Sequence, residues 1–312
     1  MEDALLDWAE SRGYEVGWSE AAAIADVLAE IEMRRQAGGF DQAFAHESLS
    51  FDARLPARIA PWKVLVVVMP RSAHIVRFLT GGHVIDTLLP PTYERYRPIF
   101  EDMRKELAGS VLRGATVETA NLPLKLLAAR LGLVRYGRNN VTYSLAAGSY
   151  VLLLGYLTDA GLPAEAHRNL QAPVLLDECA GCSVCEALCP TSAIGPDRVL
   201  LHVERCLTLA NETAGAWPAW VPEGAHNCLL GCLACQRLCP ANPEMDTDDS
   251  GIVFSEEETD ALLNGHEWNK AVWAAIRQKL EILGQPHQEA VFGRNLKALL
   301  RARNLGGERS WI

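Results

Sequence analysis

The chain is organised around one stretch of sequence, Cys179-Ala-Gly-Cys182-Ser-Val-Cys185-Glu-Ala-Leu-Cys189-Pro190. A second stretch, Cys232-Leu-Ala-Cys235-Gln-Arg-Leu-Cys239-Pro240, repeats its last three cysteines and its terminal proline. None of the 9 cysteines lies before residue 179, whereas a secreted disulfide protein would spread its cysteines along the chain. We therefore expect free thiols that bind metal, and we divide the chain into residues 1–172, 173–243 and 244–312.

The first stretch has the C-x2-C-x2-C-x3-C-P spacing of a bacterial-type ferredoxin. Three closely spaced cysteines converge on one face of a cubane cluster, while the fourth is carried away by the next turn and ligates the other cluster. Zinc is the alternative, but a zinc site is usually built from two C-x2-C pairs without the C-x3-C-P ending. The sequence therefore predicts a ferredoxin-like module with two 4Fe-4S clusters at 173–243.

Two such clusters need about eight ligands, one more than the two motifs supply. The eighth ligand is either Cys206 or Cys228, and the spacing leaves both open. The remaining cysteine is expected to be a buried thiol. Crossed ligation places one cluster on Cys179, Cys182, Cys185 and Cys239, and the other on Cys189, Cys232, Cys235 and the eighth ligand.

The segment before the cysteines is predicted to consist of helices around a mixed sheet. Lys63-Val-Leu-Val-Val-Val-Met69 is continuous and β-branched, which suits a strand covered on both faces. Ser19 is expected to cap a helix that runs to about Gln36. The other expected elements are a helix at 2–12, a hairpin of strands 74–79 and 83–88, helices at 92–112 and 121–131, and a strand at 150–158.

The segment after the cysteines is expected to be entirely helical. Residues 245–250 read as an acidic linker. Ser255-Glu-Glu-Glu258 has the pattern of a capping box that opens a helix. Two further helices are expected at 267–283 and 288–303.

The charge balance is acidic, with 29 Lys and Arg against 39 Asp and Glu and a net charge of −10. This balance argues against nucleic acid held by charge alone, because phosphate binding needs clustered basic residues. One such cluster is present near the end of the chain, and a solvated helix face is the favoured explanation for it; its members are Arg294, Lys297, Arg301 and Arg303. The sequence has no apolar run of membrane-spanning length and no secretory signal, so we expect a cytoplasmic protein without membrane contact.

Several stretches together resemble epoxyqueuosine reductase, a cobalamin- and 4Fe-4S-dependent enzyme. The strongest likeness is Arg205-Cys206-Leu-Thr-Leu followed by Gly231-Cys232-Leu-Ala-Cys235-Gln236-Arg-Leu-Cys239-Pro240-Ala-Asn242. The likeness extends to Ala128-Ala-Arg-Leu-Gly132-Leu-Val-Arg-Tyr-Gly137-Arg-Asn139, Gly148-Ser149, Leu157-Thr158-Asp159 and Gly293-Arg294-Asn295-Leu296. The resemblance implies an α+β protein, in which a nitroreductase-like α/β domain of cobalamin-binding type precedes the cluster module and a helical tail.

The resemblance also implies roles for individual residues. It favours Cys206 over Cys228 as the eighth ligand. It places Glu118 where the family has an aspartate as general acid, although a surface acid near a helix start would look the same. A corrinoid pocket would be lined by polar groups and glycines, whereas Gly137 could equally end a helix. The expected pocket residues are Arg135, Tyr136, Gly137, Arg138, Asn139, Gly148 and Ser149.

The activity implied is reductive, with electrons passing through two clusters to cobalt. The alternative is an electron-transfer protein that reduces or reactivates a corrinoid on a partner without turning over a substrate. Either reading needs an external electron donor such as a ferredoxin or flavodoxin. The substrate would be a small molecule or a modified nucleoside. We expect tRNA to be a doubtful partner, because the net charge is −10 and the family's C-terminal helical repeats are missing from the sequence given.

Overall fold

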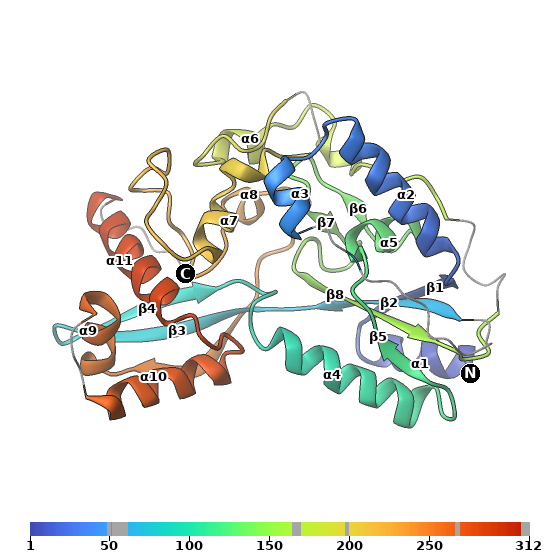
Figure 1. The fold of residues 1–312 in the computed structure, drawn as a ribbon, viewed down its shortest axis with the longest axis horizontal. Helices are drawn as coiled ribbons and strands as arrows, with labels where there is room; N and C mark the ends of the chain where they lie inside the picture. Colours follow the sequence, from blue (N-terminus) through green and yellow to red (C-terminus); the bar gives the residue numbers. More distant parts are fainter. Residues whose placement is uncertain (49–50, 52–61, 164–169, 197–199, 266–268, 307–312) are drawn as a thin grey trace.

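The computed structural model describes residues 1–48, 51, 62–163, 170–196, 200–265 and 269–306 (Figure 1). Its strands form a four-stranded sheet, a three-stranded sheet and a two-stranded ribbon. None of the described helices is long and apolar enough to cross a membrane.

The four-stranded sheet is antiparallel throughout and has the order β1-β2-β8-β5. Its central strand β2 (Lys63–Pro70) sends Val64, Val66 and Val68 to one face, and Leu65 and Val67 to the other, and all five are fully buried. This confirms the predicted strand covered on both faces. The remaining strands are β1 (Glu15–Glu20), β5 (Val117–Thr119) and β8 (Val151–Thr158).

Helices cover both faces of this sheet. Helix α1 (Glu2–Ser11) and helix α4 (Tyr96–Glu106), with the π-turn that extends it over Leu107–Val111, pack on the face that carries Leu65. Helices α2 (Ala23–Gln36) and α5 (Leu124–Arg130) pack on the opposite face. The N-terminal segment is therefore a layered domain with two separate hydrophobic cores.

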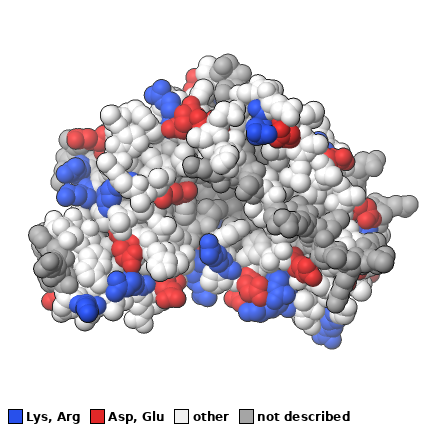
Figure 2. Space-filling view, viewed as in Figure 1, with Lys and Arg blue, Asp and Glu red and all other residues white. Residues whose placement is uncertain are grey.

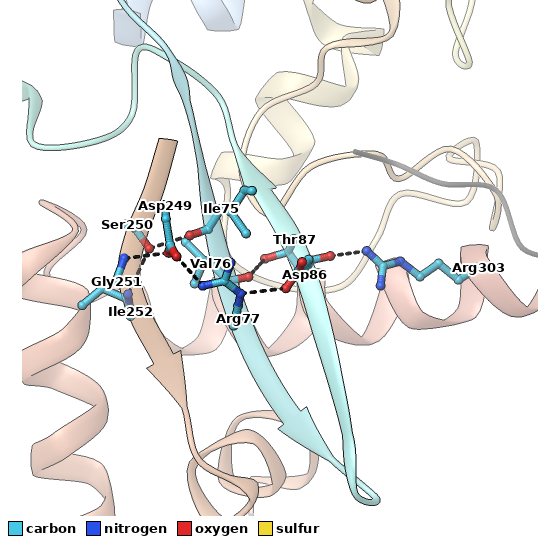
Figure 3. A network of polar contacts seen from close by, with 10 residues as sticks. All are labelled: Ile75, Val76, Arg77, Asp86, Thr87, Asp249, Ser250, Gly251, Ile252 and Arg303. Atoms are coloured by element: carbon cyan, nitrogen blue, oxygen red, sulfur yellow. Dashed lines mark hydrogen bonds and ion pairs between the residues drawn. The ribbon is translucent and has the colours of Figure 1, made fainter. Parts of the chain in front are cut away.

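The three-stranded sheet, β4-β3-β9, joins distant parts of the chain. Strands β3 (Ala73–Thr80) and β4 (His83–Leu89) form the predicted hairpin, and β9 (Thr247–Phe254) pairs with β3 in parallel. Figure 3 shows Arg77 of β3 paired with Asp86 of β4 and Asp249 of β9, so one guanidinium bridges all three strands. This sheet shares a core with α9 (Glu256–Asn264), α10 (Lys270–Ile282) and α11 (Glu289–Gly306).

The cysteine-bearing segment has only short elements. Figure 1 shows its helices α6, α7 and α8 together, between α11 on one side and the ribbon β6-β7 on the other. The elements of this segment are α6 (Val184–Leu188), α7 (Leu207–Glu212), α8 (Ala234–Arg237) and the single turns Asp177–Cys179 and Val203–Arg205. The short elements α3 (Gln42–Ser48), β6 (Arg135–Tyr136) and β7 (Thr142–Tyr143) belong to the segment before it. The cysteines are therefore held mainly by loops.

Two expectations about secondary structure are wrong. Ser19 caps no helix: it lies in β1, opposite Val64, and α2 begins four residues later at Ala23. The signal for that strand was the two-residue spacing of Val16 and Trp18, which both pack into the same core. The expected linker at 245–250 instead enters strand β9, so the tail is not entirely helical. The acidic residues of this stretch are not typical of a strand, and the strand forms by pairing with β3, which is distant in the sequence.

Other expectations are confirmed. The capping box of Ser255 and Glu258 opens α9 with both of its hydrogen bonds. Helices α1, α10 and α11 and strand β8 lie within a few residues of their predicted ranges, while the helix expected at 92–112 starts later and ends in the π-turn. The boundaries 1–172, 173–243 and 244–312 stay a prediction, because the core of the second sheet draws on residues from all three segments.

The second sheet suggests a test of its core. Phe78 of β3 and Phe254 of β9 stack with ring centroids 4.7 Å apart, and both are fully buried. Phe78→Ala should therefore lower the free energy of unfolding by about 3–5 kcal/mol, because it leaves a cavity at the strand junction. Chemical denaturation monitored by circular dichroism measures this. Leu145→Ala, at a residue 87% exposed, is the control and should change stability little; equal effects of the two variants would contradict the assignment of this core.

Candidate iron–sulfur site

Four of the cysteines face one another around a single cavity. Cys179, Cys182, Cys185 and Cys239 line it together with Gly137, Arg138, Asn139 and Tyr143. Burial raises the pKa of Cys185, and the neighbouring thiolates of Cys179, Cys239 and Cys182 raise it further. These are the four residues that crossed ligation assigns to one cluster.

A second group forms around Cys235. Burial, followed by the charges of Cys232, Cys206 and Cys189, raises its pKa, with a smaller contribution from Cys185. Burial likewise raises the pKa of Cys232 to about 11, and Cys206 and Cys189 are again the thiolates that add to the effect. The second group therefore contains Cys189, Cys206, Cys232 and Cys235.

Cys228 is placed differently from the other eight. Its side chain is fully buried, and its Sγ donates a hydrogen bond to Oδ1 of Asn227 at 3.1 Å. Burial raises its pKa strongly, and Cys232 is the one thiolate that adds to this shift. This geometry supports Cys206 as the eighth ligand and Cys228 as the buried thiol.

Several polar groups donate hydrogen bonds to sulfur atoms. The backbone N–H of Ala193 lies 3.2 Å from Sγ of Cys189, and Nδ2 of Asn227 lies 3.2 Å from Sγ of Cys232. The N–H of Arg138 and the hydroxyl of Tyr143 each lie 3.4 Å from a sulfur, those of Cys179 and Cys239 respectively. Donors aimed at thiolates suit an iron–sulfur cluster, because the reduction potential depends on hydrogen bonds to its sulfurs.

The thiols are not arranged for a single metal ion. Among the described residues, no three His, Cys, Asp or Glu side chains converge closely enough to bind one ion. A zinc ion needs all its thiolate ligands at about 2.3 Å, whereas the ligands of a cubane surround a much larger body. The donor set, two groups of four thiols with N–H donors around them, fits two clusters better than zinc.

The residues expected to line a corrinoid pocket lie against the cysteine-bearing segment. Arg138 donates to the carbonyl oxygen of Cys179 at 3.2 Å, and Asn139 donates to that of Cys235 at 3.1 Å. Arg135 pairs with Asp177, Tyr136 bonds through its backbone to Val174, and a Cβ at Gly137 would meet Tyr143 at 2.6 Å. Their described polar contacts therefore join the domain to the cluster module, and their role towards a corrinoid stays a prediction.

Gly148 and Ser149 belong to the same joint. Gly148 has a φ of +58°, and a Cβ there would lie 2.4 Å from Oδ1 of Asn242. That oxygen instead accepts the N–H of Ser149 at 2.8 Å, and the Ser149 hydroxyl donates to Gln236 at 2.9 Å. A glycine is needed here because the cluster module approaches the backbone directly.

Glu118 lies in the short strand β5 and its side chain is exposed. The next residues, 119–122, line a cavity of about 440 Å³ together with Leu124 and with Tyr96, Arg97, Phe100 and Glu101 of α4. Figure 2 shows that this side of the molecule is hollowed near its centre. Glu118 itself does not line this cavity, and because side chains alternate along a strand, it leaves β5 on the face opposite to that of Thr119. Its role as a general acid stays a prediction.

Residues 178–242 match the family model described as a 4Fe-4S double cluster binding domain. Epoxyqueuosine reductase of Staphylococcus aureus is 30% identical over 141 residues, which cover 45% of this chain and 35% of that protein. The enzyme of Pseudomonas aeruginosa is 30% identical over 179 residues, or 57% and 46% of the two chains. Over these stretches the chain is similar to epoxyqueuosine reductases.

Solved epoxyqueuosine reductases share the fold of this chain. The structure from Streptococcus thermophilus has a TM-score of 0.66 at 17% identity and covers 99% of this chain and 82% of its own. An epoxyqueuosine reductase crystallised with an epoxyqueuosine-modified tRNA stem loop has a TM-score of 0.59 at 17% identity, covering 96% and 81%. In sequence, the chain matches about a third to a half of the length of the enzymes from Staphylococcus aureus and Pseudomonas aeruginosa.

Three polar residues near the second group of cysteines were not predicted. Lys125 donates to the carbonyl oxygen of Asn140 at 2.6 Å, and its Nζ lies 5.8 Å from the centroid of the Tyr136 ring. Tyr93 donates to Glu212, and burial raises the pKa of both. A single lysine or tyrosine carries no sequence pattern, so only the structure could place them beside this epoxyqueuosine reductase-like module.

The stretch Gly293-Arg294-Asn295, one of those that resemble the family, holds two other segments of the chain through their backbone carbonyl oxygens. Arg294 donates to the carbonyl oxygens of Ala210, Thr213 and Gly215 at 2.7–2.9 Å and covers the Trp217 ring at 3.8 Å. The fully buried Asn295 donates to carbonyl oxygens of Asn211 and Leu229. Arg303 also bonds to a carbonyl oxygen, that of Asp86, so only Lys297 and Arg301 of the expected basic cluster have exposed side chains.

The surroundings of His226, which lies near Arg294 and Trp217, lead to a prediction about how the stability of the chain depends on pH. His226 is 3% exposed, and the centroid of its ring lies 4.3 Å from that of Trp217 at an interplanar angle of 54°. Its Nδ1 has no hydrogen-bond partner in the described part of the chain. Burial, followed by the charge of Arg294, lowers its pKa to about 4. The unfolded chain therefore takes up a proton near pH 6.5 that the folded chain resists, so stability falls as the pH drops from about 6.5 towards 4.

The prediction is that His226→Phe loses part of this acid sensitivity. The difference in melting temperature between pH 7 and pH 5 should be smaller in the variant than in the parent, both measured on the reconstituted chain. His83→Phe, at an exposed position, is the matched control and should keep the parental difference. An unchanged difference in His226→Phe would contradict the assignment.

Proposed function

We propose that the chain is an iron–sulfur reductase that binds two 4Fe-4S clusters. The observation that carries the proposal is the division of eight thiols into two groups of four, each with hydrogen-bond donors beside its sulfurs. The relationship to epoxyqueuosine reductases supports the reductase activity. The proposed ligands are Cys179, Cys182, Cys185 and Cys239 for one cluster, and Cys189, Cys206, Cys232 and Cys235 for the other.

The proposal includes a corrinoid as the electron acceptor of the clusters. When bound, the clusters supply one-electron transfer and the corrinoid supplies low-potential cobalt chemistry. This chain's own residues would hold the clusters, exclude water and provide a proton at Glu118. The hollow shown in Figure 2 and the 440 Å³ cavity beside β5 support a ligand on this side of the molecule.

An electron-transfer protein without a substrate is the second candidate. The observation that favours it is that residues 135–139, 148 and 149 face the cluster module, where they cannot also bind a corrinoid through the same polar groups. In both candidates an external donor such as a ferredoxin or flavodoxin would deliver electrons. Titration of the reconstituted chain with cobalamin separates them, since only the first candidate requires stoichiometric binding.

The proposed substrate is an epoxyqueuosine-modified nucleoside or a related small molecule. The net charge of −10 weighed against tRNA, whereas one structural neighbour was crystallised with a tRNA stem loop, so tRNA belongs to the proposal. Acidic and basic side chains are interspersed over the face in Figure 2. Of the predicted basic cluster near the end of the chain, only Lys297 and Arg301 have exposed side chains. Binding should therefore depend on shape more than on charge.

The ligand assignment predicts the iron content of two variants. After anaerobic reconstitution, the parent and Cys228→Ala should each hold about eight irons per chain. Cys206→Ala should lose the electron paramagnetic resonance signal of one cluster and up to half of the iron. Iron and sulfide assays with spectroscopy of the reduced chain measure this. Loss of a cluster in Cys228→Ala but not in Cys206→Ala would reverse the assignment.

The role proposed for Glu118 predicts an activity change. Glu118→Gln keeps the shape of the side chain but cannot donate a carboxylic proton, so reduction of an epoxyqueuosine-modified stem loop should slow by about 10²–10⁴-fold. Glu118→Asp, which restores the residue type of the family, should retain activity. Mass spectrometry of the product measures the rate. A rate in Glu118→Gln equal to that of the parent would assign Glu118 to the surface instead.

A further inference from the structure

The side-chain amide of Asn227 lies between two cysteines of different roles. Asn227 is 8% exposed, and its amide makes four contacts within its own loop. Oδ1 accepts the N–H of Leu233 at 2.8 Å and the thiol of Cys228 at 3.1 Å. Nδ2 donates to the carbonyl oxygen of Ala225 at 3.1 Å and to Sγ of Cys232 at 3.2 Å.

These four contacts fix which way the amide points. In the opposite orientation, Nδ2 would face two donors, and Oδ1 would face a carbonyl oxygen and a thiolate. One of the two donors to Oδ1 is the backbone N–H of Leu233, the residue directly after Cys232. The amide therefore holds both the sulfur of Cys232 and the turn that carries it.

Cys228 completes this arrangement. It is fully buried beside Leu229 and Leu230, whose side chains are also buried, so the thiol has no access to solvent. A buried polar donor is satisfied by a hydrogen bond, and the described partner of this thiol is Oδ1 of Asn227. Burial and this hydrogen bond are consistent with Cys228 being a thiol that binds no cluster.

We propose that Asn227 is a positioning residue that raises the reduction potential of the cluster held by Cys232, and that Cys228 orients its amide. The inference rests on the proposed function, because it requires Cys232 to be a cluster ligand. Reduction adds negative charge to the cluster sulfurs, and an N–H aimed at a sulfur stabilises that charge. Removing the N–H therefore shifts the potential of this cluster to more negative values.

The experiment is a redox titration, monitored by electron paramagnetic resonance, of the full chain after anaerobic reconstitution. In Asn227→Leu, the cluster held by Cys232 should become about tenfold harder to reduce at a given potential, which is about 59 mV for a one-electron couple. The other cluster, whose Cys239 receives the Tyr143 hydroxyl instead, should keep its potential.

Two variants of Cys228 test the orienting role. Cys228→Ala removes one of the two donors to Oδ1, so its shift should have the same direction as in Asn227→Leu but be smaller. Cys228→Ser retains a donor at that position and should keep the parental potential. The reduction potential should therefore shift less in Cys228→Ala than in Asn227→Leu, and it should return to the parental value in Cys228→Ser. Loss of packing alone would not produce this pattern.

Asn295→Leu is the matched control. Asn295 is also a buried asparagine, and it bonds to the carbonyl oxygen of Leu229 in the same loop without contacting sulfur. This variant should lower the melting temperature and leave both potentials unchanged. A potential shift in Asn295→Leu equal to that in Asn227→Leu would overturn the inference, because any disturbance of the loop would then suffice.

The outcomes separate the inference from the proposed function. If the parent chain binds no iron, the proposed function fails. If Asn227→Leu holds about eight irons and both potentials equal those of the parent, the clusters stand and the inference is overturned. If Cys228→Ala loses a cluster, Cys228 is a ligand and its orienting role is wrong.

Discussion

One constraint shapes the rest of the structure: thiols are held close together in buried positions, where desolvation and mutual repulsion disfavour their charged forms. Burial and neighbouring sulfurs raise the pKa of Cys185, Cys232 and Cys235, so an empty site favours protonated thiols. Iron relieves this repulsion, and the N–H and O–H groups aimed at the sulfurs share the remaining charge. The cysteine loops have little secondary structure of their own, so their shape must be imposed by what surrounds them.

The surroundings come from both ends of the chain. On one side, Arg138, Asn139 and Ser149 join the α/β domain to the cysteine loops. On the other side, Arg294 and Asn295 of α11 hold the end of α7 and the residues that follow it through their backbone carbonyls. In both attachments, most of these side chains donate hydrogen bonds to backbone carbonyl oxygens. Several residues predicted to bind a cofactor or a nucleic acid therefore use their polar groups within the protein.

Sequence patterns predicted what is local and repeated. The cysteine spacing predicted the module, and the apolar run at Lys63–Met69 and the capping box at Ser255 predicted elements that the structure contains. Strand β9 was missed because its pairing with β3 is a contact across most of the chain. Asn227 and Lys125 were missed for a similar reason: a lone amide or amine acquires its role from neighbours that only the fold supplies. The spacing left Cys206 and Cys228 open in the same way, and the proposed choice of Cys206 rests on the different surroundings of the two thiols in the fold.

The parallel pairing of β9 with β3 also sets an order of assembly. During synthesis the strands of the four-stranded sheet are complete once residue 158 has emerged, whereas the second sheet waits for residue 254. All of the cysteines are made in that interval, as an excursion that leaves one sheet and returns to the other. When β9 pairs with β3, both ends of the excursion are anchored, and this confines the segment that carries the sulfurs. The strand pairing thus shortens the search by which iron and sulfide find their ligands.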